Sequence, residues 1–219
     1  MEEMRTIRVT GKGQLKIRPD TTRIVMTLSG VYKEYADAVG HSAEDSESLK
    51  DALLPFGFAH DDLKTLQFRV DTEYEGYDDH GVYKNRLVGY RYRHVMKVEF
   101  ASDNVRLGKV LYALAHAAAE PELSIEYTVK DAEAAKNAIL ERAVADAKEK
   151  AAVLAKAADV TLQELQSVDY SWGSVELVAR PMARNMLCKA ESADASYHFD
   201  IEPDDIEASD TVTLVFRIA

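Results

Sequence analysis

Hydrophobic and polar residues alternate along several segments of the chain, and a period of two is typical of strands with one buried face. Residues 7–17 and 24–30 alternate in this way, and the turn sequence Pro19-Asp20 separates them. They are predicted to be a pair of half-buried strands. Shorter alternating segments predict further strands at residues 123–129, near 168–172 and at 212–218.

The longest alternation predicts a hairpin. Residues 65–74 and 88–100 each keep a period of two, and the polar stretch 75–81 between them is predicted to connect them. The second strand should place a row of mostly large side chains on its buried face, and that row is Val88, Tyr90, Tyr92, His94, Met96, Val98 and Phe100.

Three other segments have apolar residues at helical spacing. The first is residues 35–56, and Gly57 follows it where a left-handed cap is expected. The second begins at Asp103, with Pro121 just beyond its end. The third, residues 131–158, is rich in alanine and should be long and straight. Its narrow face of mostly small residues would let a helix or sheet approach closely, and comprises Ala135, Ile139, Ala143, Ala147, Ala151, Leu154 and Ala158.

The order of these elements predicts an α+β fold. Residues 22–130 follow the order β-α-β-β-α-β of a ferredoxin-like unit, with the long helix and further strands around it. We expect an antiparallel sheet with its helices packed on one face. No linker or change of composition divides residues 1–219, so we expect one domain, with at most a subdivision near residue 130. Residues 173–207 are predicted to be a long irregular loop.

Composition and charge narrow the possible functions. The chain of 219 residues has a formal net charge of −11, which disfavours binding to nucleic acid or anionic lipid. No apolar run is long enough to span a bilayer. The acidic start, Met1-Glu2-Glu3-Met4, does not look like a secretory signal, so we expect a soluble cytoplasmic protein, or a periplasmic or envelope protein if a leader has been removed.

The sequence TGKGQLKIRPD at residues 10–20 could be taken for a phosphate-binding loop. A Walker-type loop needs the pattern G-x-x-x-x-G-K-[ST] and a helix directly after it, and neither is found here. Gly11 and Gly13 instead fall in phase with the buried positions of a strand. We therefore expect them to mark a bulge or a close backbone contact rather than a nucleotide site.

Short motifs follow one another in a recognisable order. They are T-G-K-G at residues 10–13, Pro19-Asp20, D-L-K-T at 62–65, G-Y at 89–90, the alanine-rich run 143–155, I-E-P-D-D-I at 201–206 and the strand 212–216. In this order they resemble the signatures of the SIMPL-domain family over about residues 7–218. Two positions depart from that pattern: Asp204 replaces a usual glycine, and Ala158-Asp159 stands where the family's helix often ends in Leu-Gly.

The resemblance implies an α+β domain that tends to self-associate, usually in bacterial envelope proteins. It brings no accepted catalytic residues to carry over. The residues themselves point the same way, because the six histidines form no His-x-x-x-His or Cys/His cluster. Cys188 and His198 lack any nucleophile signature around them. We therefore expect no metal, no cofactor and no catalytic residue.

The tyrosines and arginines of the hairpin raise the alternative of nucleic acid binding, since ferredoxin-like sheets can stack bases on exposed aromatic rings. Strand parity argues against it. Tyr90 and Tyr92 share a face with the apolar residues and should point to the core, whereas Arg91 and Arg93 point the other way. We expect these arginines to pair with acidic residues on the neighbouring strand, and we predict no nucleic acid partner.

Two functional hypotheses remain. The first is a non-enzymatic, self-associating protein, a homo-oligomer whose interface includes Tyr74, Tyr77 and Tyr83, because tyrosine combines a large contact area with a polar tip. The second is a small-molecule enzyme or ligand carrier with a cleft under the loop 173–207. Four loop residues could contact an anionic ligand there, and these are Arg180, Arg184, Cys188 and His198.

Overall fold

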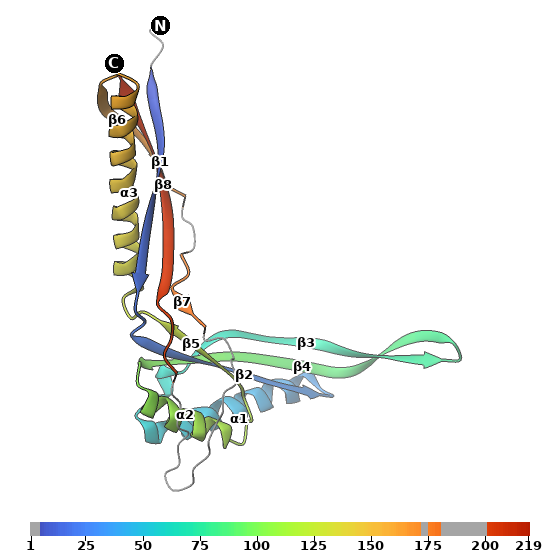
Figure 1. The fold of residues 1–219 in the computed structure, drawn as a ribbon. Helices are drawn as coiled ribbons and strands as arrows, with labels where there is room; N and C mark the ends of the chain where they lie inside the picture. The colour runs from blue at the N-terminus through green and yellow to red at the C-terminus, as the bar shows by residue number, and fades with distance from the viewer. Residues whose placement is uncertain (1–4, 172–174, 181–200) are drawn as a thin grey trace. The chain divides into compact units, whose positions relative to one another are not determined.

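The computed structural model describes residues 5–171, 175–180 and 201–219. They divide into two compact units (Figure 1). Unit 1 takes the described residues of Met1–Asp20, Thr128–Ala179 and Asp204–Ala219, and unit 2 takes those of Thr21–Tyr127 and Arg180–Pro203. The predicted α+β class is confirmed, and the strands are divided between two sheets.

Unit 2 has the predicted β-α-β-β-α-β order. Its sheet has the strand order β3-β4-β2-β5, and β4 pairs antiparallel with both of its neighbours. This is the order of a ferredoxin-like unit. The elements are β2 (Thr21–Tyr32), α1 (Tyr35–Leu53), two short 3₁₀ turns (Leu54–Phe56 and His60–Asp62), β3 (Lys64–Asp79), β4 (Val82–Ala101), α2 (Asn104–Ala115) and β5 (Glu122–Thr128).

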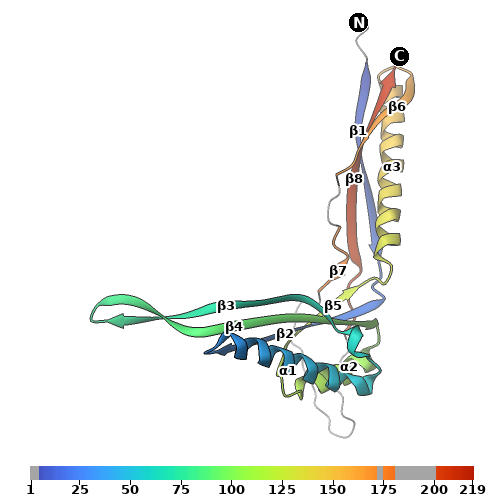
Figure 2. The same cartoon turned by 180° about the vertical axis from the view of Figure 1, so that it is seen from behind.

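Both helices of unit 2 cover the same face of its sheet, as Figures 1 and 2 show from opposite sides. Local signals set their ends. Gly57 adopts the left-handed conformation predicted for it, with φ 81°. The Asp103 carboxylate accepts hydrogen bonds from the backbone N–H groups of Val105 and Arg106 and so begins α2. The core between helices and sheet is built from Ile24, Met26, Leu28, Leu49, Leu53, Tyr92, Met96, Val98, Phe100, Leu107, Val110, Leu111 and Leu114.

Unit 1 packs one long helix on a three-stranded sheet of order β1-β8-β6. Strand β8 lies in the middle and is antiparallel to both neighbours, so β1 and β6 are the two edges. Buried alanines of the helix pack against apolar residues of β1 and β8. The elements are β1 (Thr6–Ile17), α3 (Ala132–Ala157), β6 (Leu162–Asp169), β7 (Val178–Ala179) and β8 (Ile206–Ile218).

Several element bounds differ from the prediction. The polar residues 75–81 are mostly strand, because β3 continues to Asp79 and β4 resumes at Val82. The predicted loop 173–207 contains β7, and the last strand begins at Ile206. On α3 the buried side chains keep a strict spacing of four, so Ala155 is buried and Leu154 is exposed, contrary to the predicted face.

Candidate functional site

The T-G-K-G sequence lies within β1, so no helix follows it to bind a phosphate. Gly11 and Gly13 are buried and face α3. A Cβ atom at Gly11 would overlap the carbonyl oxygen of Ala143, and one at Gly13 would overlap that of Ile139. The expected close backbone contact is therefore confirmed. These glycines let a helix backbone lie directly against a strand, which is a packing role.

Polar side chains of α3 bond to the outer backbone of β1. Arg142 donates to the carbonyl oxygen of Gln14 at 2.8 Å, and Lys150 lies 3.5 Å from that of Thr10. Between them, the Asp146 carboxylate accepts the backbone N–H of Lys12 at 2.7 Å. Hydrogen bonds from Lys150 and from this backbone N–H lower the pKa of Asp146. We call this row of contacts the capped edge of β1.

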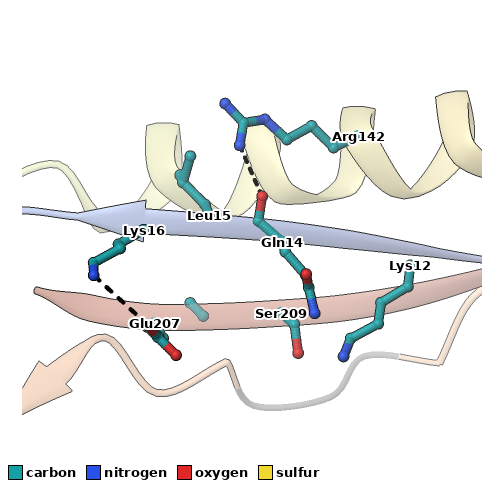
Figure 3. A pocket seen from close by; sticks show the side chains of 8 residues that line it. Lys12, Gln14, Leu15, Lys16, Arg142, Glu207 and Ser209 are labelled. Carbon is teal, nitrogen blue, oxygen red and sulfur yellow. Dashed lines mark hydrogen bonds and ion pairs between the residues drawn. The ribbon is translucent and has the colours of Figure 1, made fainter.

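A depression of about 550 Å³ lies against β1 and β8 in unit 1. In Figure 3, Arg142 lies on the α3 side of β1, whereas Lys12 and Lys16 lie on the other side with Glu207 and Ser209 of β8. Two of the cationic side chains that line it already have partners. Lys16 is 3.8 Å from Asp205 and 3.9 Å from Glu207, and Arg142 donates a hydrogen bond to the backbone. The lining gives little support for an anion site.

The four residues predicted to form a ligand loop are only partly described. Arg180 lies in the described part, and its Nε is 2.8 Å from the Glu126 carboxylate, whose side chain is 12% exposed. That contact ties Arg180 to β5. Arg184, Cys188 and His198 lie outside the described residues. The hypothesis of a ligand cleft under residues 173–207 therefore stays a prediction.

His94 is the titratable group most enclosed by hydroxyls. Its Nδ1 lies 3.3 Å from Ser42 Oγ on α1, and its Nε2 lies 2.9 Å from Thr65 Oγ1 at the start of β3. Burial lowers the pKa of His94, and the nearby Lys50 lowers it further. Since both ring nitrogens contact hydroxyls and no carboxylate orients the ring in these contacts, His94 serves to join α1, β3 and β4.

The predicted parity of the fourth strand is confirmed at Tyr92. Its side chain is buried, and its hydroxyl donates a hydrogen bond to the Asp45 carboxylate of α1. Burial and this hydrogen bond raise the pKa of Tyr92. Because the ring is enclosed by α1, it offers no open face on which a base could stack.

The hairpin continues far beyond the rest of its sheet. Strand β2 pairs with β4 only as far as Tyr32 opposite Tyr90, whereas β3 and β4 stay paired to Asp79 opposite Val82. We call residues 73–89 the outer hairpin. Figure 1 shows it leaving the end of β2 as a two-stranded ribbon. It closes in a two-residue turn at His80 and Gly81, whose φ values of 54° and 85° suit the twist of paired strands.

The predicted interface tyrosines all lie on the outer hairpin and are exposed to solvent. Their exposed fractions are 59% for Tyr74, 40% for Tyr77 and 76% for Tyr83. Two other large apolar side chains there, Val82 and Leu87, are also exposed and were not singled out from the sequence. Val88 was predicted to lie on the buried face of its strand and is instead 41% exposed, because the pairing of β2 with β4 ends at Tyr90. The length of the hairpin could have identified them, because side chains on a two-stranded ribbon that extends beyond the rest of its sheet stay exposed.

Charged side chains of the hairpin pair across its strands. Arg91 donates to both carboxylate oxygens of Glu73, at 2.9 and 2.7 Å, and Arg86 donates twice to Glu75. The hydrogen bond from Arg91 lowers the pKa of Glu73. The expectation that Arg91 pairs with the neighbouring strand is confirmed. These pairs are consistent with the register of the ribbon, and the tyrosines beside them stay exposed.

Two searches of the described residues bear on other functions. No group of three or more His, Cys, Asp or Glu side chains is placed to hold a metal ion there. Within the same residues, no helix is long and apolar enough to cross a membrane.

Comparison with known proteins adds the family. A search of curated proteins found no match to the chain. A family model described as "SIMPL: Protein of unknown function (DUF541)" matches residues 7–216, nearly the whole chain. The chain belongs to the SIMPL family. The resemblance seen in the short motifs is thereby confirmed.

Two of the SIMPL motifs meet in the structure of this chain. The T-G-K-G glycines of β1 contact the backbone of α3 at Ile139 and Ala143, within or beside the alanine-rich run 143–155. That run contains Asp146 and Lys150, the residues that bond to the β1 backbone. Both motifs therefore specify how α3 packs on an edge strand. The candidate for function lies elsewhere, on the outer hairpin of unit 2.

Proposed function

We propose that this SIMPL protein is a non-enzymatic, self-associating protein whose outer hairpin binds neighbouring copies of the chain. The observation that supports this most directly is the exposure of Tyr74, Tyr77 and Tyr83 on a ribbon that pairs with no third strand within the described residues. A two-stranded hairpin alone is marginally stable in water and gains stability from a third strand or a packed face. A neighbouring subunit supplies that face.

The chemistry of the outer hairpin suits a protein contact. Tyrosine buries a large area and keeps a polar tip, and it is enriched at the centre of protein interfaces. The ion pairs of Arg86 with Glu75, Arg91 with Glu73 and Lys84 with Asp79 already satisfy most charges of the ribbon. The ribbon therefore presents aromatic area without a strong field of one sign, which favours a contact between identical chains over binding to a polyanion.

Subunit mass measured by light scattering tests the proposal. The wild-type chain is expected to be an oligomer at micromolar concentration. Replacement of Tyr74, Tyr77 and Tyr83 by Ser removes the aromatic area, so this variant should dissociate at concentrations at which the wild-type chain does not.

The matched control places the same kind of change on α3. Val153 and Leu154 are similarly exposed, at 60% and 48%, and replacing both by Ser should leave the subunit mass unchanged. A wild-type chain that is monomeric at micromolar concentration would contradict the proposal. So would a triple variant with the wild-type mass.

A further inference from the structure

The outer edge of β3 is open along a regular segment of strand. β3 is the end strand of its sheet, and among the described residues only β4 pairs with it. Its pairing with β4 is irregular between Thr65 and Gln67 and again between Glu73 and Tyr74. Between these two irregularities, residues 67–73 form an unbroken stretch centred on Val70.

Among the described residues, this stretch has charge as its one protection, carried by Arg69, Asp71 and Glu73, and lacks the other devices by which proteins protect an edge strand. Such edges are usually covered by other elements, bulged along their length, or interrupted by proline or lysine. Residues 67–73 contain neither proline nor lysine, and their bulges lie outside the stretch. Phe68 remains about half exposed on the helix-covered side of the sheet. A strand of this kind is ready to pair with another strand.

The charges of the stretch are complementary to those of a second copy. When two copies of one strand pair antiparallel about Val70, the residues at equal distances on either side meet. Arg69 then lies opposite the partner's Asp71, and Asp71 lies opposite the partner's Arg69. Both side chains are exposed, at 54% and 58%, and lie on the same face 3.1 Å apart within one chain. Pairing thus brings together four alternating charges.

The same register matches the apolar side chains. Val70 meets the partner's Val70, and Phe68 meets the partner's Thr72 on the same face. A shift of one residue in either direction would place Arg69 beside an uncharged position. A shift of two residues would place either Arg69 opposite the partner's Arg69 or Asp71 opposite the partner's Asp71, so the charge pattern favours a single register.

From this edge and its charges we propose that two copies of the chain join their β3 strands antiparallel, with the two-fold axis at Val70, into one continuous sheet. This rests on the proposed self-association and states its geometry. A partner of another kind is less favoured, because the complementarity is of the stretch with itself.

Cysteine cross-linking tests the register. In a Cys188→Ser background, Val70→Cys places two cysteines directly opposite one another, with Cα atoms about 4.5–5.5 Å apart. That separation falls within the range a disulfide requires. Mild oxidation should convert most of this variant to a covalent dimer on a non-reducing gel.

Thr72→Cys in the same background is the matched control. It lies on the same face of the same strand, but in the proposed register the two cysteines are displaced by four residues, roughly 13 Å. It should therefore cross-link little. Equal cross-linking at positions 70 and 72, or none at position 70, would overturn the register.

A charge exchange provides a second test without cysteines. Arg69→Asp alone and Asp71→Arg alone each create two like-charged pairs across the axis, which should raise the dimer dissociation constant roughly tenfold. The double variant Arg69→Asp, Asp71→Arg restores complementarity and should return the constant to near the wild-type value. A double variant as weak as the two single changes contradicts the pairing.

The outcomes separate this inference from the proposed function. A wild-type chain that is oligomeric while Val70→Cys forms no disulfide uses a different surface, and only the β3 pairing is then wrong. A chain that is monomeric at micromolar concentration rules out both. Circular dichroism of each variant checks that the substitutions leave the fold intact, above all Val70→Cys, because Val70 is half-buried against the core of unit 2.

Discussion

Strands β1 and β3 are both edge strands of their sheets, but the surroundings of their outer backbone groups differ. The edge of β1 is capped by Arg142, Asp146 and Lys150 of α3, which bond to its outer backbone groups. The edge of β3 is not paired within the described residues, and its strand extends into an exposed ribbon. One helix is enough to cap the edge of β1, whereas the edge of β3 stays open among the described residues. This difference is the reason for assigning the proposed association to unit 2.

The contrast depends first on how closely α3 approaches β1. Gly13→Ala would drive a Cβ into the carbonyl oxygen of Ile139, so α3 must shift away from the strand. We expect the free energy of unfolding to fall by about 2–3 kcal/mol, measured by urea denaturation.

Gly40→Ala is the matched control for this change. Gly40 lies within α1 and a Cβ there would meet nothing within 4 Å. Because glycine is a poor helix residue, this variant should be more stable than the wild type by about 0.5–1 kcal/mol. Equal effects at the two glycines would show that α3 does not lie against the β1 backbone.

The cap itself can be removed with a smaller effect. Asp146→Ala deletes the acceptor of the Lys12 N–H and the partner of Lys150 at 2.8 Å. Hydrogen exchange at the Lys12 amide should become faster, while exchange in unit 2 stays unchanged. The pKa of Asp146 is lowered in the folded chain, so its contribution to stability is present above the unfolded pKa and is lost as the pH falls through the folded value.

Glu149→Ala is the control for the cap. Glu149 is exposed on the same helix and takes no part in the contacts with β1. Its replacement should leave the Lys12 amide as protected as in the wild type. If Asp146→Ala does the same, the capped edge owes its protection to something other than these side chains.

The smallest expected effect concerns the base of the open strand, which His94 joins to α1. Burial lowers the pKa of His94 below its ordinary value of 6.5. As the pH falls below 6.5, the unfolded chain binds a proton that the folded chain resists, so the free energy of unfolding should decrease. His94→Gln should flatten this decrease in denaturation curves measured between about pH 6.5 and 5.

His80→Asn serves as its control, because the His80 side chain is fully exposed at the hairpin turn and asparagine tolerates its positive φ. The variant should keep the wild-type dependence on pH. If the free energy of unfolding of His94→Gln depends on pH as in the wild type, groups other than His94 cause the loss of stability in acid.

The sequence predicted those features that depend on local spacing. Gly11 and Gly13 were in phase with a buried face, and the alanines of residues 131–158 offered a small one. The sequence therefore indicated a close-packing surface on the strand and another on the helix, but it did not show that these two surfaces pack against each other. The prediction that Leu154 lies on the buried face was wrong. The buried positions of α3 keep a spacing of four residues, slightly more than one turn, so they shift gradually around the helix and continue to Ala155.

The extent of the hairpin could not be predicted for a different reason. Residues 75–79 are polar, which normally indicates a loop, yet they are strand. A ribbon with solvent on both faces has no buried side, so its sequence has no cause to alternate. The irregularity between Thr65 and Gln67 likewise changes the side to which a residue points, and parity cannot anticipate an inserted residue.

The pairing of β1 with β8 has a consequence for biosynthesis. Thr10 and Thr213 lie side by side although 203 positions separate them along the chain. While the polypeptide emerges from the ribosome, β1 must wait for almost everything else to be translated, whereas residues 21–127 are already complete and can collapse on their own. Closing so large a loop is slow, so we expect unit 1 to complete its fold after unit 2.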